Sequence, residues 1–243
     1  TQANTGWDDA VPDDERNRWV SFFYEAFEME HIEFPRSTKP LNAVGAPILV
    51  IFSDASEDAY GACAYVRWRK LDGSYESRLL LAKSRLAPTK KITIPRLELN
   101  GALLAARLKK FISKEMRLVF AKIYCIVDSE IVLAMIQKES YGFNTFAGVR
   151  IGEIQDLTEK SDWYWIEGSL NIADIITRGC SPSVLGEGSV WQTGPVFLRD
   201  PEGEWPLKQS FTEQTLPETV VMAAQATPSC TMISDTVKID NYS

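Results

Sequence analysis

Four acidic residues stand where predicted strands end or predicted helices begin. They are Asp54 in IFSDAS, Glu98 in PRLELNG, Asp128 in IVDSEI and Asp174 in NIADIITRG. Enough chain separates each acid from the next to form a strand or a helix, so the four come from different elements. Hard divalent cations prefer oxygen ligands, and two neighbouring ions need several carboxylates around them. The pattern therefore favours two-metal chemistry on a phosphodiester.

Any one of these acids, taken alone, is more typical of an ordinary carboxylate at a strand end or a helix start. Asp174 has a specific alternative, because Arg178 follows four residues later and can pair with it along a helix. The metal-site interpretation therefore depends on all four acids meeting at one place.

The residues around these acids predict a mixed sheet flanked by helices. Apolar runs at 48–53, 61–69 and 76–84 are typical of strands, and an Asp-Gly turn signal at 72–73 joins the last two. Further strands are predicted at 122–127 and 162–167, and helices at 95–112, 129–138, 144–160 and 171–179. If the first and fourth strands are parallel neighbours, Asp54 and Asp128 leave the sheet at the same edge.

Four segments, in their order and spacing, resemble the ribonuclease H domain of long-terminal-repeat retrotransposon polyproteins of the BEL/Pao type. They are SDASEDAYGACAYVRW, LAKSRLAPTKKITIPRLELNGALLAARL, VDSEIVLAMI and NIADIITRG, and the resemblance runs from Ile48 to Gly179. It implies an α/β ribonuclease H-like fold, with a mixed five-stranded sheet of three antiparallel strands followed by parallel additions and flanked by helices. One departure is the stretch EGSLN at 167–171, which lacks the histidine that many ribonucleases H place before the last helix.

The resemblance also implies a catalytic role for each acid. Asp54 is expected to bridge two Mg²⁺ ions, for which Mn²⁺ is a substitute. Glu98 and Asp128 are expected to complete the coordination of the ion on the leaving-group side. Asp174 is expected to help hold the ion that activates the attacking water. The implied reaction is endonucleolytic hydrolysis of the RNA strand of RNA/DNA hybrids during reverse transcription.

The same resemblance divides the chain into three parts. Residues 1–47 are expected to be a connection that follows a reverse transcriptase, 48–180 the ribonuclease H domain, and 181–243 an extension and linker towards an integrase. The expected partners are the hybrid and the reverse transcriptase and integrase domains of the same polyprotein, with no membrane. The expected location is the cytoplasm, in the virus-like particle of the element, and not outside the cell.

Several residues beside the proposed ligands are candidates for contacting the substrate. Ser56, Asn100 and Ser129 could contact 2′-hydroxyls across the minor groove of a hybrid, although small polar residues at such positions also serve as caps. Arg96, in a basic stretch just ahead of Glu98, could contact a phosphate, although a charged cluster is more often a solvated surface. Arg178 is expected to support the short helix or to contact phosphate.

The net charge of −7 is unevenly distributed along the chain. Residues 1–47 carry 4 basic and 9 acidic side chains, and 181–243 carry 3 and 8, whereas 48–180 carry 19 and 16. The basic central segment suits a phosphate backbone, and the acidity belongs to the flanks. The four cysteines, Cys63, Cys125, Cys180 and Cys230, lie far apart, and with a single histidine, His31, they offer few zinc ligands. We expect reduced core thiols at Cys63 and Cys125.

The flanks have different patterns. An amphipathic helix is predicted from Asp13 to His31, and its aromatic residues would pack on a neighbouring domain. Beyond Gly179, the aromatic residues Trp191, Phe197 and Trp205 lie among prolines and could fold back on the domain. From Thr219 the composition is typical of a linker.

Two rival functions remain open from the sequence. A related exonuclease or transposase is disfavoured, because the exonucleases usually carry a second acid where this chain has Ser56, and a transposase would lack Glu98. A catalytically weak or inactive domain that tethers the polymerase to the integrase, or only binds the hybrid, is the second rival.

Overall fold

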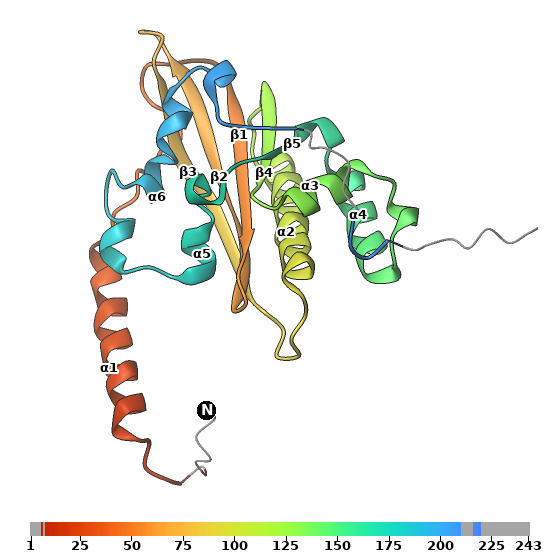
Figure 1. Cartoon of the computed structure of the whole chain (residues 1–243). Helices are drawn as coiled ribbons and strands as arrows, with labels where there is room; N and C mark the ends of the chain where they lie inside the picture. The colour runs from red at the N-terminus through yellow and green to blue at the C-terminus, as the bar shows by residue number, and fades with distance from the viewer. Residues whose placement is uncertain (1–5, 7, 210–215, 220–243) are drawn as a thin grey trace, which may run out of the picture.

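The protein is built around one mixed five-stranded sheet. The computed structural model describes residues 6, 8–209 and 216–219. The strands are β1 Ala43–Ala55, β2 Ala59–Lys70, β3 Tyr75–Leu86, β4 Lys122–Val127 and β5 Trp163–Trp165, in the spatial order β3-β2-β1-β4-β5 (Figure 1). β1, β2 and β3 are antiparallel, and β4 and β5 are added parallel to β1. The predicted ribonuclease H-like α/β class is confirmed by this topology.

The residue pattern of β1 explains its central place in the sheet. Its stretch 47–54 is buried throughout rather than alternately, as expected for a strand covered on both faces. The β2–β3 hairpin turns at the predicted Asp-Gly pair, where Gly73 has a positive φ of 84° and the Asp72 carboxylate accepts from the backbone N–H of Ser74 at 2.9 Å. β1 begins before the predicted apolar run, and β5 is shorter than predicted.

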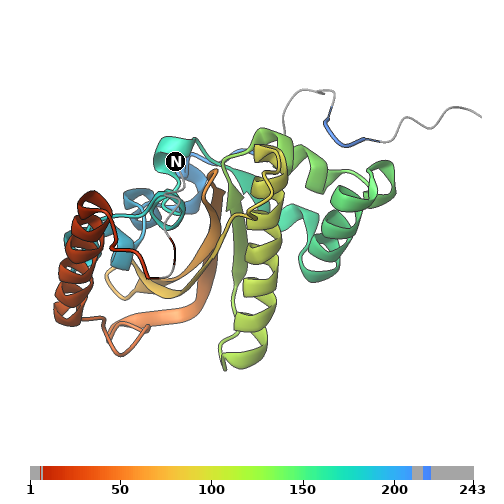
Figure 2. The ribbon, with the colours of Figure 1, turned by 90° about the horizontal axis from the view of Figure 1, so that it is seen from below.

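One face of the sheet is covered by regular helices. α2 Ile94–Glu115 and α3 Glu130–Gln137 contact the strands, and α4 Thr145–Leu157 packs beside α2, further from the sheet (Figure 2). All three lie close to their predicted ranges. The apolar side of α2, with Leu99, Leu108 and Ile112, packs on Leu49 and Ile51 of β1 in one hydrophobic core. The short 3₁₀ turns on this side are η2 Ser140–Gly142 and η3 Lys160–Asp162.

The opposite face is covered by short, irregular segments from the C-terminal part of the chain. They are η4 Gly168–Leu170, α5 Asp174–Arg178, η5 Pro182–Leu185, α6 Val190–Thr193, η6 Val196–Arg199 and η7 Glu202–Glu204. Trp191, Phe197 and Trp205 are buried against Phe52 and Tyr65 of the sheet in a second core. The expectation that these aromatic residues fold back is confirmed, and the packed core continues past the proposed boundary at residue 180.

A buried arginine holds this second layer in place. The side chain of Arg67 on β2 is 1% exposed. Its guanidinium donates to the backbone carbonyls of Leu198 at 2.7 Å and Asp200 at 2.6 Å, and to the carboxylate of Glu202 at 3.1 Å. The guanidinium also lies 3.6 Å from the centre of the Tyr75 ring. A buried charge is tolerated only when it is paired and hydrogen-bonded, and each of the three guanidinium nitrogens of Arg67 donates one hydrogen bond.

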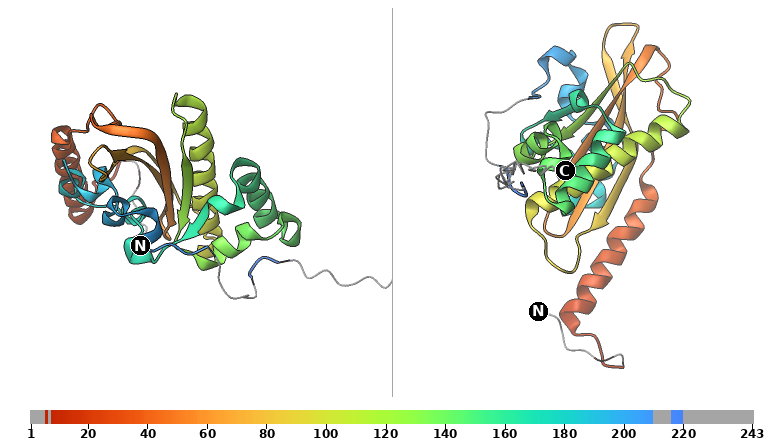
Figure 3. Two further views of the ribbon diagram at one scale, coloured as in Figure 1. Left: turned by 90° about the horizontal axis from the view of Figure 1, so that it is seen from above. Right: turned by 90° about the vertical axis from the view of Figure 1, so that its right-hand side faces the viewer.

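The N-terminal helix stands away from the sheet. α1 Asp13–Glu28, followed by η1 Met29–His31, forms as predicted and extends from the domain with no buried residue (Figure 3). Its aromatic side chains are exposed, including Trp19 at 57% and Phe22 at 56%. The neighbouring domain on which it was expected to pack remains a prediction.

Other sequence expectations are resolved in part. Cys63 and Cys125 are buried free thiols as expected, and Cys180 is an exposed one. Among the described residues, no helix is long and apolar enough to cross a bilayer. Cys230 and the predicted linker beyond Thr219 lie outside the described residues.

Candidate active site

Two of the four acids leave the sheet side by side. β1 and β4 are parallel neighbours, with Phe52 opposite Ile126, so Asp54 and Asp128 emerge at the same edge as predicted. The side chain of Asn171 ties the two strand ends together. Its Nδ2 donates to the backbone carbonyl of Ser53 at 2.9 Å, and it also hydrogen-bonds the carboxylate of Asp128.

Glu98 reaches this edge from the first turns of α2. The helix crosses β1 very closely at Gly101, where a Cβ atom would lie 2.9 Å from the backbone carbonyl oxygen of Asp54. Ser129 caps α3 by accepting the backbone N–H of Val132 at 3.3 Å, and its hydroxyl donates to Oε2 of Glu98 at 2.7 Å. Ser129 therefore orients a predicted ligand, which is a different contact from the expected one with substrate.

Asp54 lies close enough to Asp128 and Glu98 for its charge to add to the effect of burial on both of their pKa values. Burial raises the pKa of Asp128 to about 6; the negative charge of Asp54 adds to this rise, and the hydrogen bond from Asn171 opposes it. The pKa of Glu98 is raised by burial and by the charge of Asp54, and the Ser129 hydrogen bond opposes that rise. Ionising partly buried carboxylates that lie this close together costs free energy unless a cation neutralises them. The donor set, all carboxylate oxygens, fits Mg²⁺ or Mn²⁺.

Asp174 begins α5 and has a different neighbour. Its carboxylate, 45% exposed, accepts a hydrogen bond from Nε of Arg178, four residues on. This pair raises the pKa of the Arg178 guanidinium, and the charges of Asp54 and Asp128 contribute to the same rise. The alternative noted from the sequence, pairing along the helix, is thus present in the structure. A metal-binding role for Asp174 remains a prediction.

The acids are gathered without forming a ready-made metal cage. Among the described residues, no group of three or more Asp, Glu, His or Cys side chains is arranged to hold an ion. Each of three acids instead accepts from a protein donor: Asp54 from Thr177, Glu98 from Ser129 and Asp174 from Arg178. Cation binding would therefore require these carboxylates to exchange their present donors for the ion.

Thr177 and Asn171 are site residues that the sequence reasoning missed. The hydroxyl of Thr177, which is buried, donates to Oδ2 of Asp54. The hydroxyl of Ser56 donates to the backbone carbonyl of Thr177 at 2.9 Å and accepts the backbone N–H of Ala59 at 3.2 Å. Ser56 thus secures α5 against the β1–β2 turn. Asn171 and Thr177 lie within the NIADIITRG motif, so their position in that motif was the available signal.

The other candidate substrate residues lie on the flank of α2. Nε and one terminal nitrogen of Arg96 donate to the carboxylate of Glu218 at 2.9 and 2.8 Å. Asn144, the residue that caps α4, donates to the same carboxylate. The side-chain oxygen of Asn100 accepts from Nε of Arg150 at 2.6 Å. These contacts show where the side chains lie, and substrate contact by Arg96 and Asn100 remains a prediction.

Comparison with known families gives one match. The model of the Pao retrotransposon-like RNaseH-like domain matches residues 1–129, a segment that includes Asp54, Glu98 and Asp128 and ends before Asp174. No curated protein matches the chain.

Solved ribonuclease H structures are similar to parts of the chain at low identity. LC11-RNase H1 in complex with an RNA/DNA hybrid is 14% identical, with a TM-score of 0.37, over 58% of this chain and 99% of that one. The N-terminal RNase H domain of rv2228c from Mycobacterium tuberculosis, fused to maltose binding protein, is 14% identical, with a TM-score of 0.33, over 52% and 86%. RNase H1 from Halobacterium salinarum is 11% identical, with a TM-score of 0.32, over 51% and 88%. The fold assignment therefore rests on the sheet order and the family match.

Proposed function

Because the chain belongs to the Pao retrotransposon-like RNaseH-like domain family, we propose that it cleaves the RNA strand of RNA/DNA hybrids endonucleolytically by a two-metal-ion mechanism. The observation that carries this proposal is the convergence of Asp54, Glu98 and Asp128 at one sheet edge, where burial and the charge of Asp54 raise the pKa of both Glu98 and Asp128. Proteins place such carboxylates together at functional sites more readily than in structural ones.

The proposed cation ligands are Asp54, Glu98 and Asp128, with Asp174 joining them when Arg178 releases it. When bound, Mg²⁺ would lower the pKa of a water molecule and neutralise charge on the reacting phosphate. The chain's own residues orient these ligands: Ser129 holds Glu98, and Asn171 holds Asp128. Arg178, once released, presents an exposed guanidinium suited to a phosphate oxygen.

The biological setting is part of the same proposal. The hybrid would be the product of a reverse transcriptase in the same polyprotein, with an integrase as a further partner. The reaction would take place in the cytoplasmic particle of the element. The exposed aromatic side chains of α1 are compatible with packing on a neighbouring domain of that polyprotein.

Cleavage of a labelled RNA/DNA hybrid in Mg²⁺ tests the proposal. Asp128→Asn should lower the rate by at least about 100-fold, since metal ions supply several kcal/mol of charge stabilisation. EDTA should abolish cleavage by the unmodified chain. Asp156→Asn is the matched control, because Asp156 is an exposed acid on α4. Undiminished cleavage by Asp128→Asn would refute the assigned site.

A readout independent of activity separates a nuclease from a tether. Mg²⁺ or Mn²⁺ should raise the melting temperature of the unmodified chain, because an ion that binds only the folded state stabilises it. In the Asp128→Asn variant, most of this rise should be lost. In EDTA, the variant should melt at a higher temperature than the unmodified chain, because the substitution removes a crowded, partly buried charge. Hybrid binding with no cleavage and no Mg²⁺-dependent melting shift would favour the inactive tether.

A further inference from the structure

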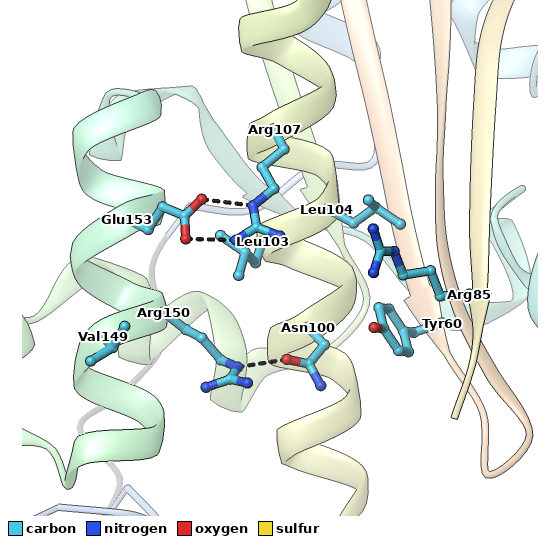
Figure 4. Close-up of a pocket in the computed structure, with 9 residues that line it drawn as sticks. All are labelled: Tyr60, Arg85, Asn100, Leu103, Leu104, Arg107, Val149, Arg150 and Glu153. Carbon is cyan, nitrogen blue, oxygen red and sulfur yellow. Dashed lines mark hydrogen bonds and ion pairs between the residues drawn. The ribbon is translucent and has the colours of Figure 1, made fainter. Parts of the chain in front are cut away.

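A polar pocket lies on the flank of α2, next to the candidate active site. Its volume is about 310 Å³. It lies between the open end of the β2–β3 hairpin, where β2 begins and β3 ends, and the helices α2 and α4 (Figure 4). The residues that line it are Tyr60, Arg85, Asn100, Leu103, Leu104, Arg107, Val149, Arg150 and Glu153. The proposed cleavage reaction makes no use of this pocket.

The charge of the pocket is positive. Three arginines line it, Arg85, Arg107 and Arg150, against one carboxylate, Glu153. Glu153 is already engaged by Arg107, whose Nε and one terminal nitrogen donate to its two oxygens at 2.6 and 2.8 Å. This bidentate pair matches the single negative charge of the pocket with one of the three positive charges, so Arg85 and Arg150 remain as excess positive charge.

Arg150 is fixed in a geometry that favours an anionic ligand. Its Nε donates to Oδ1 of Asn100 at 2.6 Å, one terminal nitrogen donates to the carbonyl of Phe146 at 2.9 Å, and the guanidinium stacks 3.6 Å from the Phe146 ring centre. Burial lowers the pKa of Arg150, and the nearby charges of Arg107 and Arg96 lower it further. An anion in the pocket would offset both costs. The side-chain oxygen of Asn100 accepts from Arg150, which leaves the two N–H groups of its amide as donors for such a ligand.

Arg85 is the exposed arginine on the strand side of the pocket. It is exposed near the end of β3, opposite Tyr60 in the β2–β3 pairing, and its side chain points towards α2 in Figure 4. Within the described ranges, no hydrogen bond or ion pair of its guanidinium is found. Its guanidinium is therefore available to a ligand that enters the pocket.

The pocket is adjacent to the acids along both elements that carry them. Asn100 lies two residues after Glu98 on α2, and Tyr60 precedes Gly61, the partner of Asp54 in the β1–β2 pairing. A nucleic-acid strand that reaches the acids would therefore pass near the pocket, with phosphates on each side of the cleaved bond.

We propose that the pocket formed by Tyr60, Arg85, Asn100, Arg107 and Arg150 binds a backbone phosphate of the nucleic acid, next to the strand position at the candidate active site. This inference rests on the proposed function for the identity of the ligand. Arginine recognises phosphate oxygens through paired N–H donors, and a phosphate contact strengthens binding without regard to base sequence.

Binding of a fluorescently labelled RNA/DNA hybrid, measured by anisotropy in EDTA over a range of salt concentrations, tests the inference. Arg85→Gln should weaken binding about threefold to tenfold and reduce the slope of log affinity against log salt by about 1, because one phosphate contact is lost. The loss should be the same for hybrids of unrelated sequence. Arg117→Gln is the matched control, because Arg117 is an exposed arginine just beyond the C-terminal end of α2.

The same assay distinguishes this inference from the proposed function. It is carried out without divalent cations, so a chain that fails to cleave can still show the Arg85 effect, and Asp128→Asn should retain that effect when combined with Arg85→Gln. Unchanged affinity and salt slope in Arg85→Gln would overturn the inference. A second arm follows the arginine Nε–Hε signals by NMR during titration with inorganic phosphate. Suppose that phosphate shifts the Arg150 signal but Arg85→Gln binds the hybrid with unaltered affinity. That combination would assign the pocket to free phosphate and would also overturn the inference.

Discussion

The two faces of the sheet are covered in different ways. One face carries α2, which packs on β1, and α3, which packs on β4 and β5, while α4 packs against α2 and α3 in the same hydrophobic core. The other carries 3₁₀ turns and two very short helices, which bury aromatic side chains and one arginine against Phe52 and Tyr65. The first layer is held by periodic apolar packing, and the second by a few specific anchors.

The candidate active site lies where the two layers meet. Glu98 comes from the helical layer, whereas Asp174 and the residues Asn171 and Thr177, which hold the strand-end acids, come from the irregular layer. Asp54 is in contact with both, through Gly101 on one side and Thr177 on the other. Disturbing either layer should therefore affect the same site, through different acids and with different costs in stability.

Arg67→Ala should have the largest effect, because it removes the anchor of the irregular layer. The carbonyls of Leu198 and Asp200 and the Glu202 carboxylate would lose their donor, and we expect the free energy of unfolding to fall by about 3 kcal/mol or more. Urea denaturation measures this loss. Arg69→Ala, an exposed arginine on the same strand, should change stability by less than about 0.5 kcal/mol. Equal effects of the two substitutions would contradict the anchoring role.

Gly101→Ala should have an intermediate effect, through the helical layer. The added methyl group would meet the backbone of Asp54, so α2 must move away from β1 and carry Glu98 with it. We expect a loss of about 2 kcal/mol in stability together with a fall in the rate of hybrid cleavage. Gly142→Ala, where a Cβ meets no atom within 4 Å, is the control. Cleavage at the unmodified rate in a destabilised Gly101→Ala would show that Glu98 needs no such close approach.

Of the three substitutions, Thr177→Val should have the smallest effect on stability, and it should lower the rate of hybrid cleavage. It keeps the shape of the side chain and removes the hydroxyl that donates to Asp54, at a cost of about 1 to 2 kcal/mol. Thr177→Ser keeps the donor and should retain cleavage, whereas the valine variant should cleave more slowly. The comparison of the two cleavage rates at matched protein stability is the measurement. Similar rates for both would mean that the irregular layer does not position Asp54.

The helical layer could be predicted from the sequence because its signals are local. The apolar spacing and Pro95 predicted a helix at 95–112, and α2 spans Ile94–Glu115. The strand runs and the Asp-Gly turn likewise gave the antiparallel part of the sheet. Buried strands and amphipathic helices follow from the periodicity of neighbouring residues, so their order could be read without coordinates.

Apart from α5, which lies within the helix predicted at 171–179, the irregular layer could be anticipated only by its aromatic residues. Its short turns carry no helical or strand period, and the partners of Arg67 lie more than 130 residues further along the chain. Its aromatic residues indicated burial, but not which face of the sheet they cover. No local pattern predicts that a strand arginine is buried under a loop that supplies carbonyl acceptors.

The sequence by itself determined which acids stand at strand ends and helix starts. The parallel pairing of β1 with β4, which places Asp54 and Asp128 at the same edge, was decided by the tertiary structure. Only the tertiary structure decided what each acid touches: Thr177 for Asp54, Ser129 for Glu98 and Arg178 for Asp174. The physical reason is range. Strand and helix formation depends on side chains a few residues apart, whereas hydrogen bonds and charge coupling depend on distances of a few ångströms between atoms that folding brings together from remote parts of the chain.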